Sequence, residues 1–160
     1  MNSRKGFSII EVIISTGIMA MFVAAFAILV TQATIISQTN ISAVRGEMYA
    51  RELIEVAKDF EVSGATSDWN TLAAGTCSSP CHPAISGNVW TLAAGEETIE
   101  NYTRSLTVED VRRDQLSFPN TIVETGGEDD PNTKKVIANV SWTAKGNTQT
   151  ISLETYVYNE

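Results

Sequence analysis

A single carboxylate lies inside a long apolar segment near the N-terminus. Residues 7–30 contain one ionisable side chain, Glu11, and the segment follows Arg4, Lys5 and Gly6. An acidic group in a membrane-spanning helix usually has a charged partner or a functional task. Glu11 is therefore the first candidate for a residue with a specific role.

Two cysteines, Cys77 and Cys81 in "TCSSPCHP", could form a disulfide or contribute to a metal site. His82 is the only histidine and there is no third thiol, so a closed zinc site cannot be completed from these residue types. We expect a Cys77–Cys81 disulfide, which would stabilise the fold by on the order of 2 kcal/mol in the chain-entropy model.

Hard oxygen ligands gather in "GGEDDPNTKK", which we expect to be a turn-rich loop. Glu128, Asp129, Asp130 and Asn132 supply carboxylate and amide oxygens of the kind that calcium accepts. Their spacing matches no EF-hand, and a solvated turn with a run of charges is the alternative interpretation. Calcium is the only cofactor for which the sequence offers candidate ligands.

Residue types for catalysis are missing. With one histidine no Ser-His-Asp arrangement can be assembled, there is no P-loop, and no pair of carboxylates stands in an apolar setting. We predict that the protein is not an enzyme. The net charge of -8 also argues against direct nucleic-acid binding, because the phosphate backbone attracts basic surfaces.

The apolar segment is long enough to cross a membrane. As a helix, residues 7–30 would span about 36 Å. Arg4 and Lys5 precede the segment, and no charge follows it before Arg45. The positive-inside tendency then places the N-terminus in the cytoplasm and the rest of the chain outside, where disulfides persist.

Three interpretations of this segment compete. A secretory signal could be cleaved after Ala27, but the apolar stretch is long for a signal and contains Glu11. An uncleaved single-span anchor fits the length and leaves Glu11 without a task. Cleavage between Gly6 and Phe7 would leave the apolar segment on the mature protein and create a new ammonium group at Phe7.

The stretch "KGFSIIEV" resembles the processing site of type IV prepilins and pseudopilins, the class III signal. The resemblance implies that prepilin peptidase cuts after Gly6 and that Phe7 becomes the N-methylated first residue. It also implies that Glu11, the fifth mature residue, meets the N-terminal amine of a neighbouring subunit during filament assembly. Four helical residues correspond to about 6 Å, so Glu11 also lies near its own amine.

The second half of the N-terminal segment predicts a continuing helix. No proline occurs before Pro80, so one helix can extend from Phe7 to about Val62. Two apolar stripes mark its upper part. The stripe that we expect to face the protein's own core consists of Tyr49, Leu53, Val56 and Phe60, and the other consists of Ile41, Val44 and Met48.

Farther along, the hydrophobic period changes to two. Alternating stretches "YTRSLTVEDV", "KKVIANVSW" and "TISLETYVY" predict strands of an antiparallel sheet, the last two joined by "AKGN" as a hairpin. The pentapeptide Thr-Leu-Ala-Ala-Gly occurs at 71–75 and 91–95, either as related strand or turn segments or by coincidence. The predicted fold class is α+β, with a long helix, transmembrane in its first half, packed on a C-terminal sheet. The strand order is similar to that of minor pilins and pseudopilins.

We therefore expect a leader peptide at 1–6, a transmembrane and filament-core helix at 7–30, its amphipathic continuation at 31–62 and a globular extracytoplasmic β domain at 63–160. Major pilins often carry a proline where Ile28 stands and a glycine where Ala20 stands, so the resemblance favours a minor pilin or pseudopilin. Glu11 argues against the tip pseudopilin type that lacks it.

The resemblance implies a structural subunit of a type IV pilus or a type II secretion-like filament. Its partners would be other pilin or pseudopilin subunits, prepilin peptidase, an inner-membrane assembly platform and, before assembly, membrane lipid. The subunit would cross the inner membrane once and reach the extracytoplasmic or cell-surface filament after assembly. The alternative is a single-span anchored extracytoplasmic binding domain that does not polymerise.

Overall fold

The computed structural model describes residues 8–60, 69–73, 80–115 and 121–159. It divides the chain into two compact units, Met1–Ser42 and Ala43–Glu160. The predicted processing positions Gly6 and Phe7, and the first cysteine of the predicted disulfide, Cys77, lie outside the described residues.

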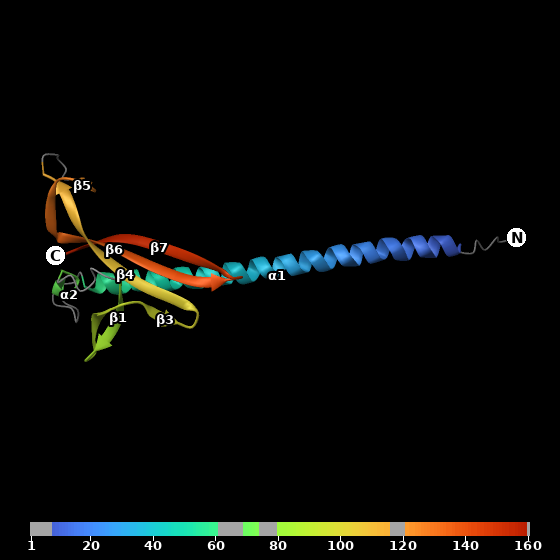
Figure 1. The fold of residues 1–160 in the computed structure, drawn as a ribbon, viewed down its shortest axis with the longest axis horizontal. Coiled ribbons are helices and arrows are strands. Elements are labelled where there is room, and N and C mark those ends of the chain that lie inside the picture. Colours follow the sequence, from blue (N-terminus) through green and yellow to red (C-terminus); the bar gives the residue numbers. More distant parts are fainter. Residues whose placement is uncertain (1–7, 61–68, 74–79, 116–120, 160) are drawn as a thin grey trace. The chain divides into compact units, whose positions relative to one another are not determined.

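Helix α1 extends without a break from Ile9 to Asp59 and contains 51 residues. It confirms the predicted long N-terminal helix (Figure 1). The segment contains no proline, and its many Ala, Ile, Leu, Met and Glu residues either favour the helix or are tolerated in it. Its residues from Ala43 onwards belong to the second unit and form one layer of that unit.

The second unit also holds the short helix α2 (Trp69–Ala73) and an antiparallel sheet of seven strands. The strands are β1 (Cys81–Ser86), β2 (Val89–Ala94), β3 (Glu97–Ile99), β4 (Tyr102–Asp114), β5 (Thr121–Val123), β6 (Glu128–Ala144) and β7 (Asn147–Tyr158). The main path runs β2-β1-β4-β6-β7, and β3 and β5 each pair with β4. The α+β, pilin-like fold class is confirmed.

The core forms where the C-terminal part of α1 lies on one face of β4 and β6. The period of two holds on these strands, since Leu106, Val136, Ala138 and Val140 are fully buried while their neighbours in sequence are less so. From the helix, apolar side chains of the predicted core-facing stripe enter the same cluster, namely Leu53, Val56 and Phe60, with Tyr49 packed at its border.

The predicted hairpin between the last two strands is confirmed. Lys145 and Gly146 connect β6 to β7 with φ angles of 53° and 78°. Two central residues with positive φ define a type I′ turn, which matches the twist of the flanking strands. The register then pairs Ala144 with Asn147 and continues along both strands to Thr133 and Tyr158.

The prediction of a turn-rich loop over "GGEDDPNTKK" was wrong for most of its length. β6 begins at Glu128, and Glu128–Asp130 pairs with the far end of β4. The register shifts between Asp110 and Val111, where β6 skips three residues that include Pro131. The strand forms despite its charges because arginines of β4 lie opposite its carboxylates.

Candidate functional site

The first turn of α1 carries Glu11. The Ser8 carbonyl accepts hydrogen bonds from the backbone N–H of Glu11 at 3.0 Å and of Val12 at 3.3 Å. Ser8 is thus the residue at which helical bonding begins. The exposed Glu11 lies in the first turn, where the helix dipole favours negative charge.

The surface that follows Glu11 is apolar and uncovered. Every residue from Ser8 to Thr34 is exposed, and large side chains such as Phe22 and Phe26 have about two thirds of their surface free, at 69% and 68%. Within the described residues, α1 is the one helix long and apolar enough to cross a membrane, and none of its apolar window is buried. A helix that is apolar all round needs lipid or other helices around it.

The hydroxyl groups of this segment are satisfied within the helix. Each of six side chains donates to a backbone carbonyl one turn earlier, at 2.6 to 3.1 Å: Ser15, Thr16, Thr31, Thr34, Thr39 and Ser42. Such bonds satisfy the donors of these six hydroxyls. The segment can therefore enter an apolar environment without a polar partner for any of these hydroxyls.

The upper part of α1 has two different faces. Leu53, Val56 and Phe60 are buried against the sheet, whereas Val44 and Met48 are 57% and 64% exposed. This division confirms the predicted core-facing stripe. The exposed stripe ends at Met48, because Arg51, Glu55 and other charged residues occupy the helix surface beyond it.

Helix and sheet approach closely at Gly46. A Cβ atom at this position would lie 2.7 Å from Cζ3 of Trp142, nearer than carbon atoms pack. The Trp142 ring is 6% exposed and contacts the Tyr102 ring, with centroids 5.6 Å apart. Gly46 is thus a packing requirement of the second unit rather than a flexible point in the helix.

A buried arginine joins three elements. The Arg104 side chain on β4 is 8% exposed; its Nε donates to Glu97 of β3 at 2.7 Å, and its Nη1 lies 3.1 Å from a carboxylate oxygen of Glu52 on α1. Its guanidinium also lies 5.8 Å from the Tyr49 ring centroid. Burial opposes the charge, but the hydrogen bonds and charges of both glutamates outweigh it and raise the pKa of Arg104.

The four calcium candidates line one hollow of about 360 Å³, where two of their carboxylates are paired with arginines. Asp129 pairs with Arg112, and Asp130 pairs with Arg113 and accepts a hydrogen bond from the Thr133 hydroxyl. The Thr133 hydroxyl and the Arg113 guanidinium hold the pKa of Asp130 below its usual range. In the described part of the chain no group of three His, Cys, Asp or Glu residues could hold a metal ion, so calcium binding stays a prediction.

Cys81, the second cysteine of the predicted disulfide, is fully buried at the start of β1. The described residues contain no free cysteine. Because Cys77 lies outside them, the pairing stays a prediction.

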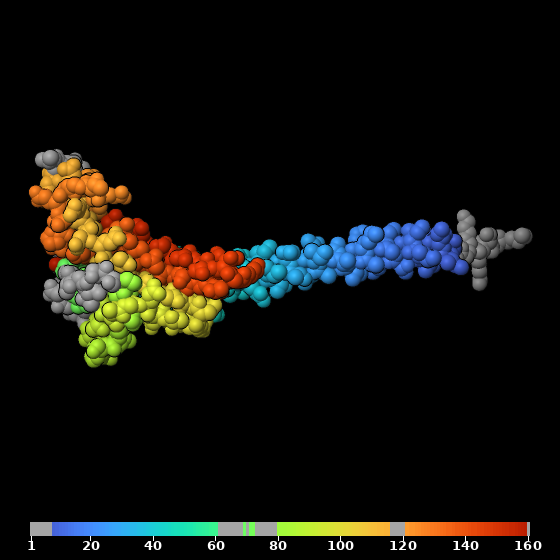
Figure 2. Space-filling model, in the orientation of Figure 1, coloured from blue at the N-terminus to red at the C-terminus, as the bar shows by residue number. Residues whose placement is uncertain are grey.

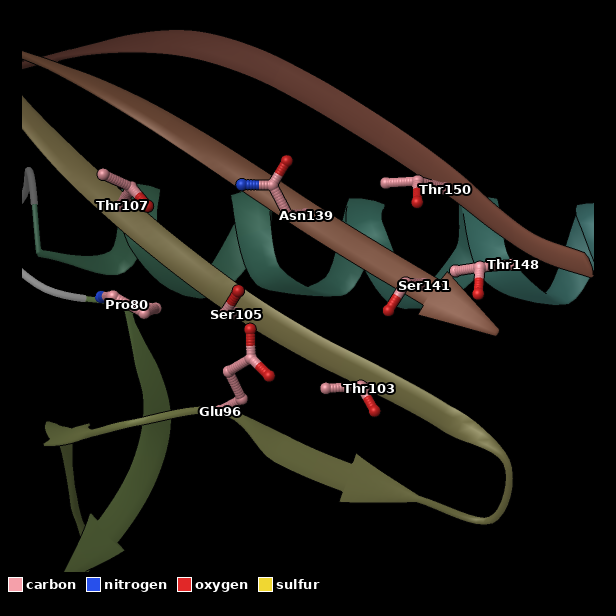
Figure 3. A pocket seen from close by; sticks show the side chains of 9 residues that line it. All are labelled: Pro80, Glu96, Thr103, Ser105, Thr107, Asn139, Ser141, Thr148 and Thr150. Carbon is pink, nitrogen blue, oxygen red and sulfur yellow. The ribbon is translucent and has the colours of Figure 1, made fainter. Parts of the chain in front are cut away.

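Neutral polar side chains line one part of the sheet face turned away from α1. A hollow of about 420 Å³ lies there between the main strands and the start of β1 (Figure 3). Glu96 contributes its one charged side chain; the rest of the lining comes from Pro80, Thr103, Ser105, Thr107, Asn139, Ser141, Thr148 and Thr150. These hydroxyls and the Asn139 amide make this part of the outer face polar.

Comparison with known protein families identifies the N-terminal segment. A model of the prokaryotic N-terminal methylation motif matches residues 1–27. The chain carries the signal of a type IV pilin-like precursor. Prepilin peptidase processes such precursors, and the signal together with the apolar helix fits membrane anchoring. No curated protein and no solved structure matches the chain.

The sequence interpretation missed Arg104 and the Gly46–Trp142 contact. A signal for Arg104 was present, because it is the one charged residue among the alternating positions of β4 that face the core, Tyr102, Arg104, Leu106 and Val108. A charge at such a position requires partners. No sequence signal identifies Trp142 as the neighbour of Gly46, since 96 positions separate them.

Proposed function

We propose that this pilin-like chain is a minor pilin or pseudopilin, a structural subunit of a type IV pilus or of a type II secretion-like filament. Prepilin peptidase would cleave it between Gly6 and Phe7, and Phe7 would be N-methylated. The observation that carries the proposal is the methylation motif over residues 1–27, whose helical part and the residues up to Thr34 are exposed on all sides. That surface would be covered by inner-membrane lipid before assembly and by the helices of neighbouring subunits afterwards.

Glu11 would set the position of each subunit relative to the next. From Ser8 to Val44 it is the only charged residue, so a cation beside this apolar part of the helix has one possible acidic partner there. The N-terminal ammonium of an adjacent subunit is such a cation. An ion pair in an apolar environment contributes more to register than to stability, because its desolvation cost offsets much of the attraction.

Incorporation into filaments tests this proposal. Filaments are sheared from cells that express the full chain, and the amount of the subunit in the sheared fraction is measured against that in the membrane. Glu11→Ala should lower the incorporated fraction at least about tenfold, because removing one partner leaves a buried charge unpaired. Glu55→Ala, which removes an exposed glutamate from the same helix, is the matched control and should assemble normally.

Two outcomes would contradict the proposal. Equal incorporation of the Glu11→Ala and Glu55→Ala chains would show that Glu11 has no role in register. Full recovery of the wild-type chain in membranes, with none in sheared filaments, would favour a single-span anchored domain that does not polymerise.

A further inference from the structure

The β1–β2 hairpin is attached to the sheet by very little backbone pairing. Six residue pairs join β1 to β2, but only one pair, Cys81 with Leu106, joins β1 to β4. The buried residues of the hairpin, such as Cys81 and Leu92, lie at its attached end. Beyond that end, the hairpin stands out from the rest of the second unit (Figures 1 and 2).

The projecting end of this hairpin is uncharged and partly apolar. Ile85 is 68% exposed and lies opposite the half-buried Trp90. Residues 69–95 contain no Asp, Glu, Lys or Arg, in a chain with 19 acidic and 11 basic residues. Isolated two-stranded hairpins are marginally stable in water, so a further strand paired with this hairpin would stabilise it.

The outer edge of β2 has backbone groups to offer such a strand. Gly87 and Asn88, with φ of 59° and 71°, form a two-residue turn. In a hairpin with a two-residue turn, hydrogen-bonded residue pairs alternate with pairs that are not hydrogen-bonded to each other, starting from the hydrogen-bonded pair next to the turn. Trp90, Leu92 and Ala94 belong to the second kind, so their N–H and C=O groups point away from β1. Among the described residues, no strand pairs with this edge.

Strand β7 forms the opposite edge of the sheet. By the same alternation from the Lys145–Gly146 turn, Thr150, Ser152 and Glu154 direct their backbone groups away from β6. β7 is 12 residues long, has Glu154 as its only charged residue, and contains no proline or lysine. Charged side chains, lysine above all, and proline normally prevent an edge strand from pairing with another chain. Because β7 carries only one of these residues, its edge is open to a further strand.

We propose that the β2 edge of one copy pairs with the β7 edge of a neighbouring copy, so that one sheet continues from subunit to subunit. This inference rests on the proposed filament. Two different edges make a head-to-tail contact, which forms open helical assemblies when its rotation does not close a ring. Both edges are also nearly free of charge, so two acidic chains can approach there with little repulsion.

Photo-crosslinking within filaments tests the contact. Ala94, an exposed residue of the β2 edge, is replaced in the full chain by p-benzoylphenylalanine. Sheared filaments are irradiated, and crosslinked dimers are analysed by mass spectrometry. We expect adducts between position 94 and residues 147–158 of a second copy. Adducts confined to residues 81–95 of the second copy, adducts only with another protein, or no dimer in filaments that contain the chain would each overturn the proposal.

A proline on the β7 edge provides the second arm of the test. Ser152→Pro removes an N–H that faces away from β6, a position where edge strands tolerate proline. It should lower the yield of the adduct between position 94 and β7 about fivefold or more, as expected for the loss of one net hydrogen bond. Ser152→Ala, which keeps the N–H, should crosslink like the parent chain.

If Ser152→Pro melts below the parent chain in near-UV circular dichroism, Thr150→Pro on the same edge replaces it. An unchanged adduct yield in a folded proline variant would refute the pairing. The same preparation also shows whether the chain is incorporated into filaments. A chain that is present in filaments but forms no adduct refutes the edge contact alone. A chain that is absent from filaments refutes the proposed function.

Discussion

Substitution of Gly46 by alanine should weaken the packing of α1 on the sheet. The added Cβ would lie 2.7 Å from Cζ3, 3.1 Å from Cε3 and 3.2 Å from Cη2 of Trp142. Carbon atoms pack at about 3.5 to 4.0 Å, so the helix and the ring must separate by almost 1 Å. The ring cannot turn away freely, because it is buried and Tyr102 lies against it.

The expected change in the free energy of unfolding is the sum of two opposing effects. Overpacking of a filled core costs about 1 to 3 kcal/mol. Alanine in place of glycine inside a helix recovers about 1 kcal/mol. The net loss should lie between about 0 and 2 kcal/mol, with about 1 kcal/mol as the central value, and for a unit of this size 1 kcal/mol lowers the Tm by about 4 °C.

Thermal unfolding of the full chain in detergent, followed by near-UV circular dichroism of the aromatic residues, measures this loss. Gly17→Ala is the matched control in the same helix, since no atom lies within 4 Å of its added Cβ, and it should leave the Tm of the sheet unit unchanged. In a Trp142→Phe background, which removes the outer ring of the indole, Gly46→Ala should cost about 1 kcal/mol less. The same cost of Gly46→Ala in the Trp142→Phe background as in the parent chain would refute the contact.

Three further substitutions test the interior and the charge network of the second unit. Leu53→Ala, at a fully buried position, should lower the free energy of unfolding by about 2 to 5 kcal/mol in chemical denaturation, and a loss below 1 kcal/mol would contradict its place in the core. Glu97→Gln should cost about 1 to 2 kcal/mol because it leaves the buried Arg104 with Glu52 as its sole carboxylate, and a neutral effect would argue against the network. Asp130 should contribute stability above its unfolded pKa of about 3.9 and lose it as the pH falls through its lower folded pKa. Asp130→Asn should therefore show a flatter loss of unfolding free energy below about pH 4, and identical pH profiles would contradict the lowered pKa.

Much of the fold follows from local sequence patterns. The absence of proline before Pro80 and the apolar period of the N-terminal segment predicted α1, and the period of two predicted the buried faces of β4 and β6. The "AKGN" segment predicted the β6–β7 turn because only a few residue types adopt the required positive φ angles. These features depend on neighbouring residues, so one sequence is sufficient to predict them.

Features that depend on long-range pairing could not be predicted. Residues Glu128–Asp130 look like a solvated loop until Arg112 and Arg113 lie opposite them across the β4 bulge. The repeated Thr-Leu-Ala-Ala segment also shows that a short sequence does not determine its own secondary structure. Its first copy is helical from Thr71 to Ala73 in α2, whereas its second copy, Thr91 to Ala94, forms part of β2. Tertiary context overrides local propensity in such short segments.

The mature N-terminus tests the central claim most directly. The full chain is purified from membranes and filaments of cells that contain a prepilin peptidase, and its intact mass and N-terminal peptide are determined by mass spectrometry. Our account predicts that residues 1–6 are absent and that the chain begins with Phe7 carrying one methyl group on its amine. An intact N-terminus that retains the leader, or a chain that begins at Ile28, would contradict it.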